Sequence, residues 1–239
     1  MKKVLCIGEA LIDMICTDKG TTLSKGQNFI KKPGGAPANV AAAIGSLGGF
    51  VEMAAKVGND PFGQQLIDVM NDFGVSTKWM LKDNEHFTTM AFVSLLENGE
   101  RDFVFNRGAD GYLSKDDLKA IDLTEFSIIH FGSATAFLPG LLQGTYTYFL
   151  QKAIQENVFV SFDPNYRHLL FQNNTQAFIH QAWNFLTQCD FFKLSDEEAL
   201  LITGCTNVNE AVDILSQKQK PYSLLLWDTK GLCCDSIRL

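Results

Sequence analysis

The sequence predicts an α/β fold with a doubly wound, mostly parallel sheet, helices on both faces, and a small β lid beside it. Short β-rich runs alternate with helical patterns along the 239 residues, which is the rhythm of βαβ units. The apolar runs are nearly continuous rather than alternating, as expected for parallel strands that are covered on both faces. We therefore expect one α/β domain over residues 1–239.

The predicted elements follow one another in a regular order. A β-rich run covers residues 3–11, a helix of small residues begins near Asn39, and the next β-rich run covers residues 51–58. Asp60 is suited to cap a helix that has Pro61 at its first position and stops at Gly74. Later runs and helices are predicted over residues 126–133, 139–156, 158–165, 175–188, 189–195 and 222–227.

A hairpin signal breaks this alternation. Residues 87–108 contain two β-rich runs around Glu97-Asn98-Gly99-Glu100, and Asn-Gly is the strongest short signal for a hairpin. We expect this hairpin to lie outside the main sheet and to form a small β lid together with residues 14–32. The pattern alone fits an ordinary antiparallel sheet edge equally well.

Composition and charge disfavour several classes of protein. The formal net charge of −7 argues against a nucleic-acid or anionic-membrane surface, and no window reaches the apolar length of a membrane span. The six cysteines form no CxxC pair, which disfavours structural zinc and a disulfide framework. Acidic residues occur too early in the chain for a signal peptide, so we expect a cytoplasmic protein.

Three predicted strands are followed by residues that can carry chemistry. In a doubly wound sheet, ligands bind beyond the carboxyl ends of the strands. Asp13 follows the first run in GEALIDM, DPNYR (residues 163–167) follows a middle run, and KLSDEE (residues 193–198) follows a late one. Together these segments offer a carboxylate for hydroxyl groups, a cation and an amide for phosphate, and a carboxylate for magnesium.

Each of these segments also has a purely structural interpretation. Asp13 fits a turn cap, DPNYR is rich in turn formers, and Arg167 fits a surface charge. Ser195 and Glu198 have the spacing of a helix capping box. Only their joint placement at strand ends favours function.

A glycine-rich stretch, KKPGGAPANVAAAIGSLGG, precedes and enters the first helix. Gly34 and Gly35 allow backbone conformations closed to other residues and let the chain approach a ligand closely. Asn39 can offer its amide to a sugar hydroxyl, although a glycine turn before a tightly packed helix explains the pattern as well. The sequence has no GxxxxGK[ST] and no GxGxxG motif, which disfavours nucleotide binding by those two routes.

Taken in order, these motifs resemble the PfkB (ribokinase-like) carbohydrate kinases, and within that family the fructokinases. The resemblance runs from about Val4 to about Gly231 and is carried by GEALIDM, GGAPANVAAAIGSLGG, DPNYR and KLSDEEALLITG. It implies an ATP-dependent kinase that transfers the γ-phosphate to a sugar hydroxyl, with fructose as the expected sugar. A kinase for a riboside or another sugar, and a non-catalytic sugar-binding or dimerising fragment, are the alternatives.

The resemblance also implies roles for single residues. The sugar would be bound by Asp13 and Asn39, by the hinge at Gly34 and Gly35, and by Phe105 and Arg107 of the lid. Phosphate and ATP would be bound by Asn165, Arg167 and Lys193, with Thr229 and Gly231 in a turn on the ATP side. Glu198 would hold Mg²⁺ through water, and a complete homologue would be a candidate for a monovalent cation as well. The lid would join two copies in a homodimer.

The second signature of the family, DTxGAGD, is absent from the 239 residues. In the family its aspartate is the base for the attacking hydroxyl, and its glycine amides neutralise charge on the transferred phosphate. No residue of this chain is therefore assigned as catalytic. We expect the C-terminal part of the kinase domain to be missing, and this chain alone to be inactive or nearly so.

Overall fold

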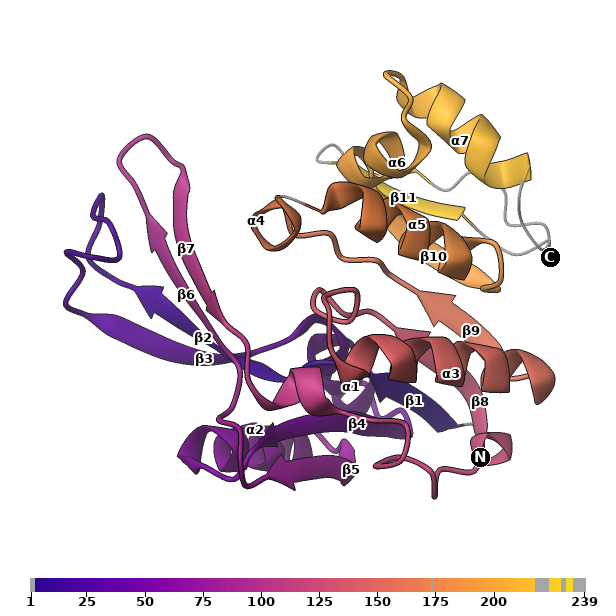
Figure 1. Ribbon diagram of the computed structural model, residues 1–239, viewed down its shortest axis with the longest axis horizontal. Helices are drawn as coiled ribbons and strands as arrows, with labels where there is room; N and C mark the ends of the chain where they lie inside the picture. Colours follow the sequence, from indigo (N-terminus) through magenta and orange to yellow (C-terminus); the bar gives the residue numbers. More distant parts are fainter. Residues whose placement is uncertain (1–2, 173, 218–223, 229–230, 234–239) are drawn as a thin grey trace.

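The strands of the computed structural model form one large sheet and one small sheet (Figure 1). The structure describes residues 3–172, 174–217, 224–228 and 231–233, the last two stretches by their backbone alone. The large sheet contains β1 (Lys3–Ile7), β4 (Val51–Gly58), β5 (Ser76–Asp83), β8 (Phe126–Phe131), β9 (Phe159–Phe162), β10 (Phe191–Ser195), β11 (Leu224–Asp228) and β12 (Gly231–Cys233). Their order is β12-β11-β10-β9-β8-β1-β4-β5, and every neighbouring pair is parallel except β11 and β12. The predicted doubly wound, mostly parallel sheet is confirmed.

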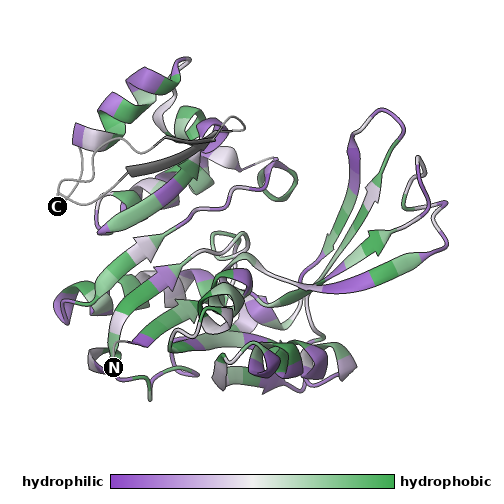
Figure 2. Ribbon diagram, turned by 180° about the vertical axis from the view of Figure 1, so that it is seen from behind, coloured by the Kyte–Doolittle hydropathy of each residue, from purple (hydrophilic) through white to green (hydrophobic). Residues whose placement is uncertain are grey.

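Helices cover both faces of this sheet. They are α1 (Ala36–Ser46), α2 (Pro61–Asp72), α3 (Leu141–Gln155), α4 (His168–Phe171), α5 (Thr175–Leu186), α6 (Asp196–Thr203) and α7 (Val208–Gln217), with 3-10 turns η1 (Ala109–Tyr112) and η2 (Leu123–Glu125). One core lies between α1, α2 and the sheet, and a second lies between α3, α5, α6, α7 and the sheet. In β1, Cys6 faces the first core while Leu5 and Ile7 face the second. Both faces of β1 are apolar for this reason. In Figure 2 the ribbons of the central strands are coloured largely as hydrophobic.

Local sequence signals place the first two helices. Asp60 caps α2 as predicted, because its Oδ1 atom accepts hydrogen bonds from the amides of Phe62 (2.9 Å) and Gly63 (2.8 Å). Helix α1 begins at Ala36, three residues before the expected start, because the chain already turns at Gly35 (φ 104°). Asn39 therefore lies in the first turn of α1.

The small sheet is built from two separate segments of the chain. It contains β2 (Leu11–Cys16), β3 (Phe29–Gly34), β6 (Met90–Leu95) and β7 (Arg101–Asn106), in the order β3-β2-β6-β7. Strands β6 and β7 are antiparallel and meet at a turn with Gly99 at φ 84°, so the predicted hairpin outside the main sheet is confirmed. We call these four strands the lid sheet; they project away from the large sheet in Figure 1. The lid sheet begins at Leu11, earlier than expected, so Asp13 lies within a lid strand.

None of the helices in the described part of the chain is long and apolar enough to cross a membrane.

Candidate functional site

A cavity of about 330 Å³ lies where the lid sheet meets the carboxyl ends of β1, β8 and β9. This is the edge of a doubly wound sheet at which ligands bind. The cavity brings together six of the residues predicted from sequence, and its lining is Glu9, Leu11, Asp13, Gly35, Ala36, Asn39, Ala91, Phe103, Phe105, Ala134, Thr135, Asn165, Arg167 and Leu170. Segments that are far apart in the sequence therefore form one polar cavity.

The carboxylate of Asp13 lies on the lid side of this cavity. Its strand β2 runs beside β3, and a β-carbon on Gly34 would lie only 2.3 Å from Oδ2 of Asp13. Burial raises the pKa of Asp13, and the nearby Arg167 guanidinium opposes that rise. Asp13 is thus a half-buried carboxylate with a cation close by.

Gly35 forms the joint between the lid sheet and α1. It has a φ of 104°, and a β-carbon there would lie 2.5 Å from the carbonyl oxygen of Glu9. Both the conformation and the close approach therefore require glycine at this position. The carbonyl oxygen of Gly35 accepts a hydrogen bond from the amide of Asn39 (2.9 Å), which places Asn39 in the first turn of the helix.

The loop after β9 carries Asn165 and Arg167 and is anchored at two points. Lys193 in β10 pairs with Asp163 (Nζ to Oδ2, 3.2 Å). The amide of Tyr166 donates to Oε1 of Glu198 (2.7 Å). Both anchors come from β10 and the start of α6, so that neighbouring segment fixes the loop that lines the cavity.

Lys193 and Glu198 do not line the cavity themselves. Glu198 has only 6% of its surface exposed, and its second oxygen accepts from the amide (2.7 Å) and the hydroxyl (2.9 Å) of Ser195. The predicted capping box is confirmed. The residues that the structure describes contain no cluster of three metal-binding side chains, and both carboxylate oxygens of Glu198 already accept hydrogen bonds. Its role through a water molecule stays a prediction.

Two predicted residues on the ATP side are only partly covered by the structure. Gly231 begins β12, where it lies opposite Asp228. Thr229 lies outside the described residues. Their binding of ATP stays a prediction.

Arg107 is bound below the lid rather than among the residues that line the cavity. Its Nε atom donates to Asp110 (3.3 Å), and its two terminal nitrogens donate to the carbonyl oxygens of Pro139 (2.6 Å) and Thr135 (3.1 Å). Arg107 thereby fastens the end of β7 to the loop between β8 and α3. Phe105, two residues earlier, does line the cavity.

Most of the chain matches the model of one protein family. The family model described as "pfkB family carbohydrate kinase" matches residues 1–225. The chain belongs to the pfkB family of carbohydrate kinases. The resemblance of its four motifs to this family is thereby confirmed.

Among pfkB relatives, the chain is similar to plant fructokinases. It is 35% identical to Fructokinase-2 of Oryza sativa subsp. japonica over 217 residues, which are 89% of this chain and 63% of that protein. The chain spans 63 to 70% of the length of this and two further plant fructokinases.

Solved pfkB structures share the fold described above. A fructokinase from Xylella fastidiosa with bound ATP superposes with a TM-score of 0.80 at 31% identity, covering 96% of this chain and 73% of that one. A fructokinase double mutant from Vibrio cholerae O395, in a form with bound fructose, ADP and potassium ion, gives a TM-score of 0.82 at 27% identity, covering 99% and 73%.

Sequence reasoning missed Glu9, which lines the cavity of this pfkB chain with only 1% of its surface exposed. It stands in GEALIDM, two residues after the end of β1, whose last residues are fully buried. A charged residue in such an apolar stretch was the sequence signal that could have identified Glu9 as a candidate site residue. Its partners are distant in sequence, so the pattern did not reveal what it binds.

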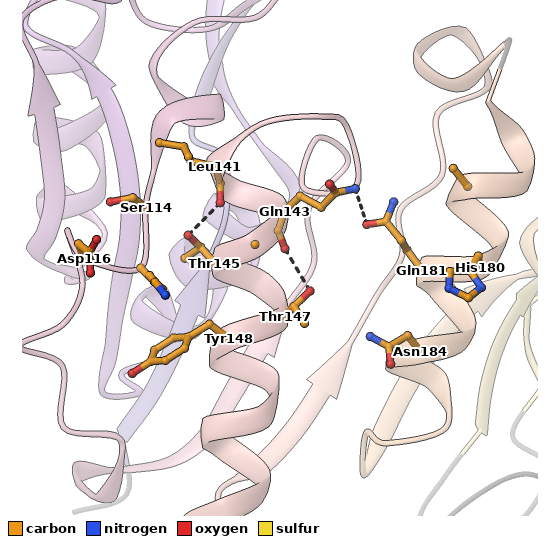
Figure 3. A pocket seen from close by; sticks show the side chains of 13 residues that line it. Ser114, Asp116, Leu141, Gln143, Thr145, Thr147, Tyr148, His180, Gln181 and Asn184 are labelled. Carbon is orange, nitrogen blue, oxygen red and sulfur yellow. Dashed lines mark hydrogen bonds between the residues drawn. The ribbon is translucent and has the colours of Figure 1, made fainter.

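A larger groove of about 880 Å³ lies between α3 and α5 on the outer face of the pfkB fold (Figure 3). Its polar side chains largely bind one another or their own helix: Gln143 donates to Gln181 (2.8 Å), and Thr147 donates to the carbonyl oxygen of Gln143 (3.2 Å). It contains none of the residues predicted from the sequence motifs. The smaller cavity under the lid sheet is therefore the candidate site.

Proposed function

We propose that this chain is the sugar-binding part of an ATP-dependent sugar kinase whose substrate is fructose. One observation carries the proposal: Asp13, Asn39, Asn165 and Arg167 converge on one cavity beneath the lid sheet. The carboxylate of Asp13 accepts hydrogen bonds from hydroxyl groups, and the amide of Asn39 both donates and accepts them. This combination suits a polyhydroxylated, uncharged ligand.

Arg167 and Asn165 supply the chemistry for a phosphoryl group. Phosphoryl transfer depends mainly on positioning and on stabilising negative charge, and a guanidinium serves both purposes. The two residues sit at the carboxyl end of β9, opposite the lid strand that carries Asp13. We propose that the sugar lies between Asp13 and Asn39 with its reacting hydroxyl directed toward Arg167.

The relatives support this assignment. Bound ATP in the Xylella fastidiosa structure, and fructose with ADP in the Vibrio cholerae structure, are the ligands expected for such a site. Because a polypeptide of these 239 residues carries no DTxGAGD sequence, we propose that it binds sugar without turning it over at an enzymatic rate. The lid-mediated homodimer and the cytoplasmic location stay predictions.

Sugar-dependent thermal stabilisation of the purified 239-residue chain tests the proposal. Fructose should raise the melting temperature of the wild type and of Asp72→Asn, an exposed control on α2, but not of Asp13→Asn. Glucose, ribose and adenosine should raise the melting temperature less than fructose does. A flat response to fructose, or an Asp13→Asn variant that responds like the wild type, would refute sugar binding at this cavity. ADP release at an enzymatic rate in the presence of ATP, Mg²⁺ and fructose would refute the expected inactivity alone.

A further inference from the structure

The carboxylate of Glu9 caps helix α1 from another part of the chain. Gly35, at the N-cap position, has no side chain that could accept a hydrogen bond from the first turn. Instead Oε1 of Glu9 accepts from the amide of Ala36 (3.0 Å), the first residue of the helix. A carboxylate at this position also complements the helix dipole. Glu9 therefore satisfies a helix end that its own sequence leaves uncapped.

The same carboxylate holds the loop between β8 and α3. Oε1 also accepts from the amide of Ala134 (3.3 Å), and the hydroxyl of Ser133 donates to Oε2. Glu9 thus joins three walls of the cavity: the end of β1, the start of α1 and the loop after β8.

Asp110 makes similar contacts to the segments where the chain enters and leaves the lid sheet. It accepts from the hydroxyl of Thr89, just before β6, and from Nε of Arg107, just after β7 (3.3 Å). The hydroxyl of Thr89 in turn accepts from the amide of Gly108 (2.9 Å). Glu9 thus binds the segment that leaves the lid sheet after β3. Asp110 binds the segments that enter it before β6 and leave it after β7.

A single hydroxyl connects these two carboxylates. Thr135 Oγ1 lies 2.7 Å from Oδ2 of Asp110 and 3.5 Å from Oε2 of Glu9. A hydroxyl has one proton to donate, and the shorter distance assigns it to Asp110. The hydroxyl of Ser133 is then the close donor that remains to Oε2 of Glu9.

We propose that Glu9 is a positioning residue of the sugar site, which fixes Gly35 and Asn39 through the first turn of α1 and holds that turn more firmly when the carboxyl is ionised. This inference rests on the proposed function, since it names what keeps the sugar-binding residues in place. In the ionised form both amide contacts are charge-assisted hydrogen bonds, which are stronger than those to a neutral carboxyl.

The surroundings of Glu9 favour proton exchange near neutral pH. Burial is the main cause that raises the pKa of Glu9 to about 7, and the charge of Asp110 adds to the rise, while the hydrogen bonds from Ser133 and Ala36 oppose it. The titratable or charged groups packed around Glu9, or lining the same cavity, are Asp110 of η1, Arg107 after β7, Tyr146 of α3, Asp13 of β2 and Arg167 before α4. Arg107 pairs with Asp110, so no cation is bonded to Glu9 itself among the residues whose side chains are described.

Nuclear magnetic resonance of the amides tests the proposal without requiring activity or sugar. Between pH 5.5 and 8.5, the backbone amide of Ala36 and the side-chain amide of Asn39 should shift together with one apparent pKa near 7. Glu9→Gln keeps an acceptor oxygen for Ala36 and Ala134 but cannot titrate, so both signals should stay constant. Glu125→Gln removes an exposed carboxylate far from the cavity. In this variant the two amide signals should shift with pH as they do in the wild type. Signals that do not move in the wild type, or that move equally in Glu9→Gln, would overturn the proposal.

Fructose affinity measured by calorimetry tests the positioning itself. Glu9→Ala should weaken binding about tenfold at pH 8, whereas Glu9→Gln should stay within about threefold of the wild type and lose its pH dependence between 6 and 8.5. A folded Glu9→Ala variant with wild-type affinity would overturn the proposal, and if this variant does not fold, the comparison of wild type with Glu9→Gln decides. A wild type that binds no fructose would refute the proposed function, while the amide titration would still decide the role of Glu9.

Discussion

Gly34 lies so close to Asp13 that a β-carbon on the glycine would be 2.3 Å from Oδ2 of the carboxylate. Gly34 is not among the residues with positive φ, so its backbone conformation is open to other residues. The constraint at this position is therefore one of space. The absent side chain leaves room for the carboxylate that we assign to the sugar.

Gly34→Ala should displace the Asp13 carboxylate and weaken fructose binding about tenfold or more. Overpacking at such a contact costs about 1–3 kcal/mol of stability, so the variant should still fold. Calorimetry gives the affinity and urea unfolding gives the stability. Gly144→Ala is a matched control, because its β-carbon would point into open space within α3, and it should gain about 0.5–1 kcal/mol without a change in affinity. Unchanged fructose affinity in Gly34→Ala would show that the position of Asp13 is not needed for binding.

Arg167→Ala should raise the pKa of Asp13 further. Burial already raises this pKa above its ordinary value, and the charge of Arg167 is the influence that lowers it. Asp13 would then be protonated at a higher pH than in the wild type. Once protonated, its carboxyl group no longer accepts hydrogen bonds with both oxygens. The ¹³C shift of the Asp13 carboxyl carbon, followed over pH, measures this directly. Lys119→Ala, which removes an exposed lysine that does not line the cavity, should leave the titration of Asp13 unchanged. Equal titration curves for Arg167→Ala and wild type would contradict the expected coupling.

Glu198→Gln should loosen the loop that carries Asn165 and Arg167. Both oxygens of Glu198 accept hydrogen bonds, from Tyr166 and from Ser195, and an amide nitrogen in place of one oxygen would face a donor. The loss of one charged hydrogen bond and the mismatch together should cost about 2–4 kcal/mol. Urea unfolding measures that cost, and calorimetry with ATP in the presence and absence of Mg²⁺ tests the predicted metal role. If Glu198→Gln unfolds like the wild type but loses the Mg²⁺ dependence of ATP binding, Glu198 serves the metal rather than the loop.

The features that the sequence predicted correctly depend on neighbours in the chain. The cap at Asp60, the hairpin at Asn98-Gly99 and the capping box at Ser195 each join residues only a few positions apart. Their hydrogen bonds are local, so a short pattern contains all the information needed. The motifs after β1 and β9 reach one cavity because parallel strands of one sheet end at the same edge.

The features that the sequence did not predict depend on contacts between distant segments. Glu9 meets Ala134 across 125 positions, and Arg107 meets Pro139 across 32. No local pattern carries such pairs. The hydrogen bond from Tyr166 to Glu198 also joins residues that are far apart in the sequence. The sequence therefore did not reveal this structural role of Glu198 beside its proposed metal role.

His130 should make the protein less stable as the pH falls from 6.5 to 4. Its side chain in β8 is buried, with 8% of the surface exposed, and burial lowers its pKa to about 4 from the ordinary value of 6.5. Nδ1 lies 3.0 Å from the hydroxyl of Ser161, and Nε2 has no hydrogen-bond partner among the described residues. Because the folded pKa is the lower one, the neutral ring favours the fold above pH 6.5. That contribution, at most about 3 kcal/mol, is lost as the pH falls through this window.

Urea unfolding at pH 7.5, 6.5, 5.5 and 4.5 measures this loss by comparison with His130→Asn, which cannot titrate. The stability of the wild type relative to the variant should be constant above pH 6.5 and should then decrease by up to about 1.4 kcal/mol per pH unit toward pH 4.5. His180→Asn, which removes an exposed histidine of α5, should follow the wild type. Parallel pH profiles for wild type and His130→Asn would mean that the folded protein protonates this ring as readily as the unfolded chain, which is incompatible with a closed environment around β8.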